Sequence, residues 1–278
     1  MNDRIAIWGD GAVGTGLAVA LSSHFDTVLL GPPGSGRGQA LVTASGFIQG
    51  STHVLKAESG DEITADNCIV AVKAYHIPNI VEDLSSSFDS CISVVNGMGL
   101  SPLWGDMADG VEYAVLTAGF NLKEPGRVEC SDGAVTVQRG AAAESIFQDC
   151  SIPVETTGDM ETVRWSKWLV NSVINPLGAV SRLRNDMLLQ AGLDCSIEAL
   201  FDELVKGVPA GCRESAAERA RHTLDELLRG SANCSSMLQD VLAGRRTEID
   251  FLTGLLPSLS NEEAPLTNFL TALVRALS

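Results

Sequence analysis

The chain has 278 residues, of which 45% are hydrophobic and 19% charged, so it is long enough for two domains with buried cores. Its formal net charge of −16 argues against nucleic acid and against an anionic membrane surface as partners, because both require a basic face. We interpret the excess acid as a solubilising surface. An anionic ligand must therefore bind where a few cations are concentrated locally.

The cysteines give no sign of a disulfide framework or of a metal site. There are seven of them, none forms a C-x-x-C pair, and several lie in apolar runs such as CIVAV and CISVV. This pattern predicts buried thiols in a reducing compartment. A strand-like run begins at Arg4, which leaves no room for a signal peptide, and no apolar run approaches the roughly 18 residues of a membrane span. The sequence therefore predicts a cytoplasmic protein.

The first half of the chain alternates short apolar runs with helical or loop segments. We predict strands at residues 4–8, 27–30, 67–72, 91–95, 113–117 and 134–138. The first four are almost continuously apolar, which is typical of parallel strands covered on both faces. A helix over residues 15–23 joins the first two strands through a right-handed crossover, and the segment 31–38 (GPPGSGRG) is predicted to be a loop.

Helical periodicity replaces this alternation from about Asp159 to Leu277. The sequence thus predicts an α/β fold with a doubly wound parallel sheet of the Rossmann type over residues 1–157. An all-α C-terminal domain follows over residues 158–278.

A glycine-rich turn follows the first predicted strand and opens a helix, in the sequence GDGAVG. In a G-x-G-x-x-G turn the first glycine permits the tight turn and the second lets the backbone approach a pyrophosphate. The third lets helix and strand pack closely. This context predicts a dinucleotide site, with a purely structural glycine turn as the alternative. The cofactor-binding residues at the turn are Gly9, Gly11, Ala12, Val13 and Gly14.

The end of the second predicted strand bears on the choice between NAD and NADP. An NAD-binding domain usually carries an acid there for the ribose 2′-hydroxyl, but no acid occurs between Asp26 and Glu58. The following loop offers Arg37, whose guanidinium suits a 2′-phosphate. The sequence therefore predicts NADPH as the cofactor, unless Arg37 is only a solvated loop cation.

Two further strand ends carry polar residues that are candidates for ligand binding. The third predicted strand ends at Lys73 and the fourth at Asn96, which begins the segment NGMG. Ligands of open parallel sheets bind beyond the carboxyl ends of the strands. An Asn-Gly pair can also form a hairpin turn, but no alternating strand follows it at once, which favours a ligand loop.

The segment 161–175 (ETVRWSKWLVNSVIN) is predicted to be a largely buried helix with one polar stripe. Lys167, Asn171 and Asn175 recur every four residues along that stripe. Pro176 disfavours further regular helix, so Asn175 is expected near the end of the helix or at a kink. Because unpartnered polar groups are costly to bury, we expect the stripe to line a wet cleft. A solvent-facing stripe of an ordinary amphipathic helix is the alternative.

A second polar set lies downstream. Asn233, Ser236 and Asp240 share a helical face, and Glu248 falls in an apolar row with Val241, Leu252 and Leu255 at seven-, four- and three-residue steps. An acid in such a row is either paired with a cation or functional. The structural alternatives are a salt bridge from Glu248 to Arg245 or Arg246, and a helix cap for Ser235.

Taken together, these segments resemble the ketopantoate reductase family over nearly the whole chain. The motifs that carry the resemblance are GDGAVG, VKAYH, NGMG, WSKWLVNSVINPLGAV and SSMLQDVLAGRRTEIDFLTG. The resemblance implies a Rossmann domain and a helical domain, with NADPH and substrate in the cleft between them. It also implies reduction of 2-dehydropantoate to pantoate, a step toward coenzyme A.

The resemblance further implies roles for individual residues. Lys167 matches the catalytic lysine, which protonates the ketone oxygen and stabilises the developing alkoxide, and Glu248 matches the acid that bonds the substrate hydroxyl. Lys73 matches a nucleotide-contacting lysine, and Asn96 a residue near both nicotinamide and substrate. Asp240 matches a nearby acid. The residues that match substrate-positioning groups are Asn171, Asn175, Asn185, Asn233 and Ser236.

The segment 117–121 (TAGFN) departs from the family pattern, since it lacks the histidine or arginine-rich run often found there. The contacts to the substrate's tail are therefore expected to differ from the family pattern. Two other functions remain as alternatives: a reductase of another branched or bulky 2-oxo acid, which would differ only in its side-chain pocket, and a non-catalytic NADP-sensing module. Helical second domains of this kind often pair, so a homodimer is also considered.

Overall fold

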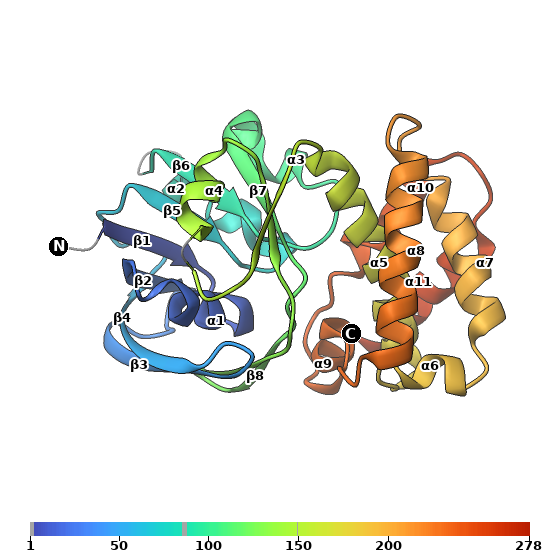
Figure 1. Ribbon diagram of the computed structural model, residues 1–278, viewed down its shortest axis with the longest axis horizontal. Helices are drawn as coiled ribbons and strands as arrows, with labels where there is room; N and C mark the ends of the chain where they lie inside the picture. The colour runs from blue at the N-terminus through green and yellow to red at the C-terminus, as the bar shows by residue number, and fades with distance from the viewer. Residues whose placement is uncertain (1–2, 85–87, 149) are drawn as a thin grey trace. The chain divides into compact units, whose positions relative to one another are not determined.

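The computed structural model describes residues 3–84, 88–148 and 150–278. The chain divides into two compact units (Figure 1), residues 1–95 with 101–160 and residues 96–100 with 161–278. This division lies next to the boundary predicted from the sequence. It also assigns the segment 96–100 to the second unit, which the sequence did not suggest.

The first unit is built on a mixed sheet with the strand order β11-β10-β7-β6-β5-β1-β2-β4-β3-β9-β8. Its central six strands are mutually parallel. When these six strands are numbered 1 to 6 along the chain, their order in the sheet is 3-2-1-4-5-6. This is the strand order of a Rossmann fold, and it confirms the predicted fold class. The six strands are β4 (Gly50–Glu58), β2 (Phe25–Gly31), β1 (Asp3–Trp8), β5 (Asn67–Val70), β6 (Ser90–Ser93) and β7 (Val111–Leu116).

Five strands of this sheet were not predicted from the sequence. They include the outer strand β8, whose residues are all exposed or partly exposed, so the apolar signal is weak. The strand β4 is also mostly exposed at its start, and it becomes buried only toward its end, where Lys56 and Glu58 interrupt the apolar pattern. Besides β4, the missed strands are β3 (Gly38–Gly46), β8 (Phe120–Glu124), β9 (Arg127–Cys130) and β11 (Val154–Thr157); β10 (Val135–Gln138) was predicted.

Helices cover the sheet and bury its central strands. α1 (Ala12–Leu21) packs on β3 and β9, and α4 (Ala142–Phe147) packs on β7 and β10. Ile5 and Ile7 of β1 join Leu17 and Leu21 of α1 in one core, while Trp8 is buried on the opposite side of the strand. The short helical segments of this unit are η1 (Ala74–Asn79), α2 (Val81–Leu84), α3 (Ser101–Trp104) and η2 (Gly105–Gly110).

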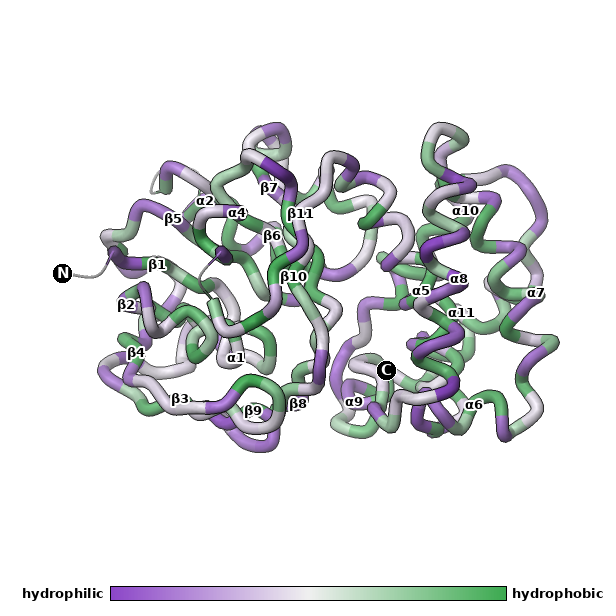
Figure 2. The backbone as a smooth tube through the Cα atoms, viewed as in Figure 1, coloured by the Kyte–Doolittle hydropathy of each residue, from purple (hydrophilic) through white to green (hydrophobic). Residues whose placement is uncertain are grey.

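The described part of the second unit contains helices and no strand, as predicted. The amphipathic pattern is visible in Figure 2, where α8 alternates hydrophilic and hydrophobic residues. The elements are α5 (Met160–Ser181), α6 (Met187–Gln190), α7 (Asp194–Val205), α8 (Arg213–Gly230), α9 (Ser236–Leu242), η3 (Ile249–Phe251), η4 (Thr253–Leu255), α10 (Leu256–Leu259) and α11 (Pro265–Leu277).

One helix of this unit extends beyond its proline, and one helix prediction was wrong. α5 continues through Pro176 to Ser181, so the helix does not end near Asn175, because burial of Ile174, Leu177 and Ala179 outweighs the one backbone hydrogen bond that proline removes. The helical row from Val241 onward is interrupted instead, since α9 ends at Leu242 and a short 3-10 segment begins at Ile249.

Two further predictions concern the cysteines and membrane-spanning segments. Cys68, Cys91, Cys130 and Cys212 are buried free thiols and Cys150 is partly buried, whereas Cys195 and Cys234 are exposed, contrary to a uniformly buried set. Among the described residues, no helix combines the length with the apolar character that a membrane-crossing segment needs.

Candidate functional site

The three glycines of the GDGAVG turn meet three different steric demands. Gly9 has φ +117°, and a Cβ atom there would lie 2.7 Å from the Ala71 carbonyl oxygen. A Cβ on Gly14 would lie 1.7 Å from the Gly9 carbonyl oxygen, whereas one on Gly11 would meet no atom within 4 Å. Gly9 and Gly14 are thus required by the fold of the turn itself. Gly11 instead leaves open space beside the backbone, as an approaching ligand requires.

The start of α1 provides hydrogen-bond donors at this open space. Gly11 caps the helix without any side-chain cap, so the first N–H groups of the helix, including those of Ala12 and Val13, have no side-chain acceptor from the cap. Such a helix start attracts phosphate through its N–H groups and its dipole. The geometry therefore fits the pyrophosphate of a dinucleotide.

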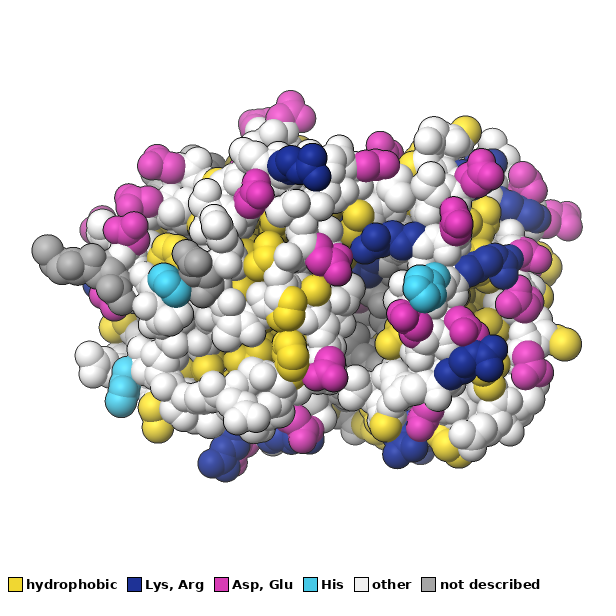
Figure 3. All heavy atoms as spheres, viewed as in Figure 1, with side chains coloured by type: hydrophobic (Ala, Val, Ile, Leu, Met, Phe, Trp, Pro, Cys, Tyr) yellow, Lys and Arg dark blue, Asp and Glu magenta, His cyan; other side chains and the backbone are white. Residues whose placement is uncertain are grey.

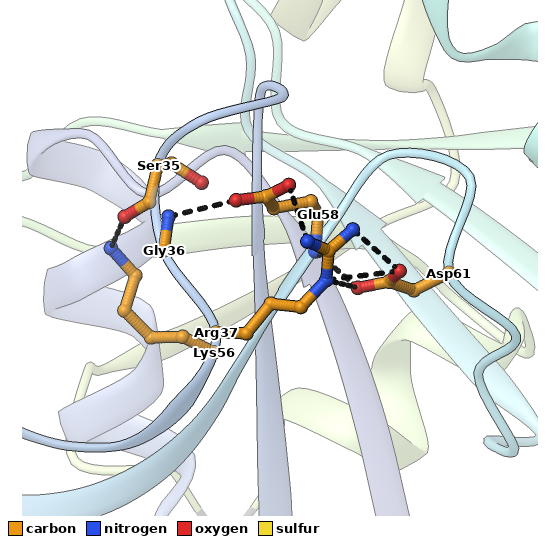
Figure 4. Close-up of polar contacts among 6 residues, drawn as sticks. All are labelled: Ser35, Gly36, Arg37, Lys56, Glu58 and Asp61. Carbon is orange, nitrogen blue, oxygen red and sulfur yellow. Dashed lines mark hydrogen bonds and ion pairs between the residues drawn. The ribbon is translucent and has the colours of Figure 1, made fainter.

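The loop after β2 holds Arg37 in a network of carboxylates, drawn in Figure 4. The Arg37 Nε and Nη2 atoms donate to the Asp61 carboxylate at 2.9 Å, and Nη1 lies 3.0 Å from Glu58 Oε2. These contacts raise the pKa of Arg37, chiefly through the hydrogen bond to Asp61, and lower the pKa of Asp61. Arg37 is thus no isolated solvated cation, although its side chain is 61% exposed.

The carboxylate of Glu58 lies beside the end of β2 but belongs to the neighbouring strand β4. Glu58 is the last residue of β4 and lies opposite Gly31 in the parallel pairing. Its side chain is buried, and Oε1 accepts a hydrogen bond from the Gly36 N–H group at 3.0 Å. This acid was not predicted from the sequence, because an acid is expected directly after β2. Recognising the β3–β4 hairpin would have revealed it.

A second ion pair connects the glycine turn to β4. Lys56 Nζ donates to Asp10 Oδ2 at 3.0 Å and to the Ser35 carbonyl oxygen at 3.2 Å. Both side chains of the pair are about a quarter exposed or less, at 22% and 25%. Lys56 therefore neutralises an acid that lies inside the glycine turn, and neither residue was singled out from the sequence.

The two other strand-end candidates occupy different units. Lys73 follows β5 and precedes η1, within the first unit, whereas Asn96 opens the segment assigned to the second unit. In that unit the Phe251 carbonyl oxygen accepts hydrogen bonds from the Met98 N–H group at 3.1 Å and from Trp168 Nε1 at 3.2 Å. The next element is α3, so the prediction of a loop in place of a hairpin is confirmed.

The polar stripe of α5 passes from partly exposed to buried positions. Lys167 and Asn171 are partly exposed, and Asn175 is 8% exposed. Although part of its side chain is accessible, burial lowers the pKa of Lys167 to about 8, and the charge of Glu248 acts in the opposite direction. Glu248 is itself buried, just before η3. A lysine whose pKa is lowered by burial therefore interacts with the charge of a buried carboxylate.

The remaining predicted substrate-binding residues cluster around the start of α9. The Asn185 N–H group donates to the Asn233 carbonyl oxygen at 3.1 Å, and the buried Asn185 Oδ1 has no hydrogen-bond partner among the described residues. Asn233 is exposed and precedes α9, so it does not share a helical face with Ser236, the first residue of that helix. Ser235 is the helix cap, accepting from the Leu238 N–H group at 3.2 Å.

The arginines considered as structural partners of Glu248 pair with other acids. Arg245 Nε lies 3.0 Å from Oδ1 of the buried Asp240, and Arg246 lies 3.8 Å from Asp250. On the face drawn in Figure 3, acidic side chains are scattered over both units and basic ones form separate small groups. The cations near the predicted sites therefore act against an acidic background.

Comparison with known proteins assigns both units to one family. The family model described as "Ketopantoate reductase PanE/ApbA" matches residues 5–143, and the one described as "Ketopantoate reductase PanE/ApbA C terminal" matches residues 159–278. A 2-dehydropantoate 2-reductase from Pyrococcus horikoshii is 29% identical, with 98% of this chain and 97% of that protein covered.

Solved structures show the same fold at lower identity. A dimeric ketopantoate reductase from Staphylococcus aureus is similar with a TM-score of 0.81 at 20% identity, covering 99% of this chain and 98% of that one. D-mandelate dehydrogenase, solved with NADH and anilino(oxo)acetate, has a TM-score of 0.80 at 19% identity, with the same coverage. On the two family matches, this chain belongs to the ketopantoate reductase PanE/ApbA family.

Proposed function

We propose that this protein reduces 2-dehydropantoate to pantoate, with NADPH as the reductant. The observation that carries the proposal is the interaction of Lys167, whose pKa is lowered to about 8, with the buried carboxylate of Glu248. Both residues lie in the segments that match the family model, and the curated relatives across several organisms are 2-dehydropantoate 2-reductases.

The glycine turn would hold the dinucleotide. Gly11 and the first N–H groups of α1 would receive the pyrophosphate, and Arg37 would receive the 2′-phosphate that distinguishes NADPH. The bound nicotinamide supplies the hydride that reduces the ketone carbon. Lys73 is proposed to contact the nucleotide, and Asn96 to lie near nicotinamide and substrate.

Lys167 is proposed to act as the general acid. Its ammonium group would donate a proton to the ketone oxygen as negative charge develops there, and its charge would stabilise the incipient alkoxide. The carboxylate of Glu248 would accept a hydrogen bond from a substrate hydroxyl and orient the ammonium. The residues proposed to position the substrate are Asn171, Asn175, Asn185, Asn233 and Ser236.

The pKa of Lys167 predicts the pH dependence of the reaction. A general acid must be protonated, so kcat/KM for reduction should be constant below pH 8 and fall about tenfold per pH unit above it, since kcat/KM reports the free enzyme. Oxidation of the hydroxy acid needs the neutral amine and should rise through the same pH. Initial rates in both directions test this prediction, and two profiles without opposite slopes would contradict it.

A panel of 2-oxo acids tests the substrate. We expect 2-dehydropantoate to have the highest kcat/KM among branched, aromatic and short 2-oxo acids, measured with NADPH and with NADH. The groups that would bind the carboxylate and ketone serve any 2-oxo acid, so only the panel separates 2-dehydropantoate from a bulkier substrate. If 2-dehydropantoate ranks among the poorest substrates, the chain is a reductase of another 2-oxo acid.

We also propose a homodimer as the assembly. The support is the relative from Staphylococcus aureus, whose structure is described as dimeric.

A further inference from the structure

We propose that Glu58 and Asp61 set the nucleotide preference of this protein, by competing with the 2′-phosphate of NADPH for the guanidinium of Arg37. The consequence is weak discrimination, so that NADH binds nearly as well as NADPH. The inference rests on the proposed function only in assuming a nicotinamide dinucleotide at the glycine turn.

The network lies where a dinucleotide-binding sheet places the adenosine ribose. In such folds the group at the end of the second strand contacts the ribose 2′ position. Here β2 ends at Gly31, and a Cβ atom on that residue would lie 2.2 Å from Ser35 Oγ and 2.8 Å from Asp10 Oδ2. The end of β2 thus carries no side chain of its own. The side chains that approach it come from the glycine turn, from the following loop and, through Glu58 opposite Gly31, from β4.

The guanidinium of Arg37 is already committed to carboxylates. Each of its three nitrogens contacts one: Nε and Nη2 reach Asp61 at 2.9 Å, and Nη1 reaches Glu58 at 3.0 Å. The contact with Asp61 has the bidentate geometry in which arginine binds both carboxylates and phosphates. A 2′-phosphate must therefore displace or share a carboxylate to gain this cation, whereas NADH has no such requirement.

The charge count points in the same direction. Arg37 contributes one positive charge against two negative charges from Glu58 and Asp61. Lys56, the other cation of the cluster (Figure 4), is itself bonded to Asp10 and to the Ser35 carbonyl oxygen. A phosphate carrying up to two negative charges thus enters a cluster without surplus positive charge.

The two acids hold the arginine by different means, which makes them separable. Glu58 is 8% exposed and is anchored by the Gly36 N–H group. Asp61 is 27% exposed and accepts the Glu58 N–H group at 2.9 Å. Glu58→Gln and Asp61→Asn each keep an oxygen that can accept these backbone bonds while removing a negative charge. The loop should keep its conformation in the Asp61→Asn variant even if Glu58→Gln folds poorly.

Equilibrium binding of the two nucleotides tests the proposal. Dissociation constants for NADPH and NADH would be measured by fluorescence titration on the full chain, without substrate. We expect wild-type values that differ by less than about tenfold, and a gain of about five- to tenfold in NADPH affinity in Asp61→Asn and Glu58→Gln, with NADH changed by less than about twofold. The matched control is Glu62→Gln, which removes the same charge from a neighbouring position and should change neither constant.

The dependence on Arg37 completes the test. In the double variant Arg37→Ala/Asp61→Asn the gain in NADPH affinity should disappear, because the cation that the phosphate acquires is gone. The proposal is overturned if both single variants leave the NADPH-to-NADH affinity ratio at its wild-type value, if Glu62→Gln shifts it equally, or if the double variant keeps the gain. These titrations measure nucleotide binding without turnover. They therefore test the nucleotide preference even if the 2-oxo acid panel does not support the proposed substrate.

Discussion

Replacing Lys167 by alanine should lower kcat for 2-oxo acid reduction by about a hundred- to ten-thousandfold while leaving nucleotide affinity nearly unchanged. The proposed acid is removed, and with it the positive charge that stabilises the developing alkoxide. Because the pKa of Lys167 is lowered to about 8 by burial, loss of its ammonium also removes a partly desolvated charge, so the variant should fold. Steady-state kinetics with saturating nucleotide, together with nucleotide titration, measure the two effects separately.

Lys206→Ala provides the matched control in the same unit. Lys206 lies at the end of α7 in a surface ion pair with Glu262, and exposed pairs of this kind contribute little to stability. This variant should retain wild-type kcat. If Lys167→Ala also retained it, Lys167 would not be the acid.

Replacing Gly11 by alanine should weaken binding of both NADPH and NADH by at least about tenfold, with a melting temperature within about 2 °C of wild type. The added methyl group meets no atom of the described residues within 4 Å, and the Gly11 φ of −79° suits any residue. The loss would come from crowding between the methyl group and the pyrophosphate. Titration with each nucleotide and thermal unfolding are the measurements.

The contrast with Gly14→Ala makes this result specific. There the methyl group would lie 1.7 Å from the Gly9 carbonyl oxygen, so helix and turn must separate and the melting temperature should fall together with nucleotide affinity. Unaltered affinity in a stable Gly11→Ala protein would mean that the phosphates do not approach this part of the turn.

Local pattern was sufficient for much of the fold. The apolar runs of β1, β2, β5 and β6 predict buried parallel strands, since both faces of each are covered. The glycine turn and the polar stripe of α5 could also be predicted, because a tight turn and a helical period each depend on residues close together in the sequence. Lys167 could therefore be singled out from its position in the sequence pattern alone.

The features that could not be predicted from the sequence depend on pairing between segments far apart in the chain. Glu58 reaches the end of β2 only because β4 pairs with it in parallel register, and Arg37 is held only because Asp61 follows that strand. Likewise, the segment after β6 is held by Phe251, far along the chain. The sequence by itself determined the alternation of strands and helices, the glycine turn and the polar stripe that carries Lys167. Only the tertiary structure decided which charges surround Arg37, because strand register, unlike periodicity, is set by contacts between residues far apart in the chain.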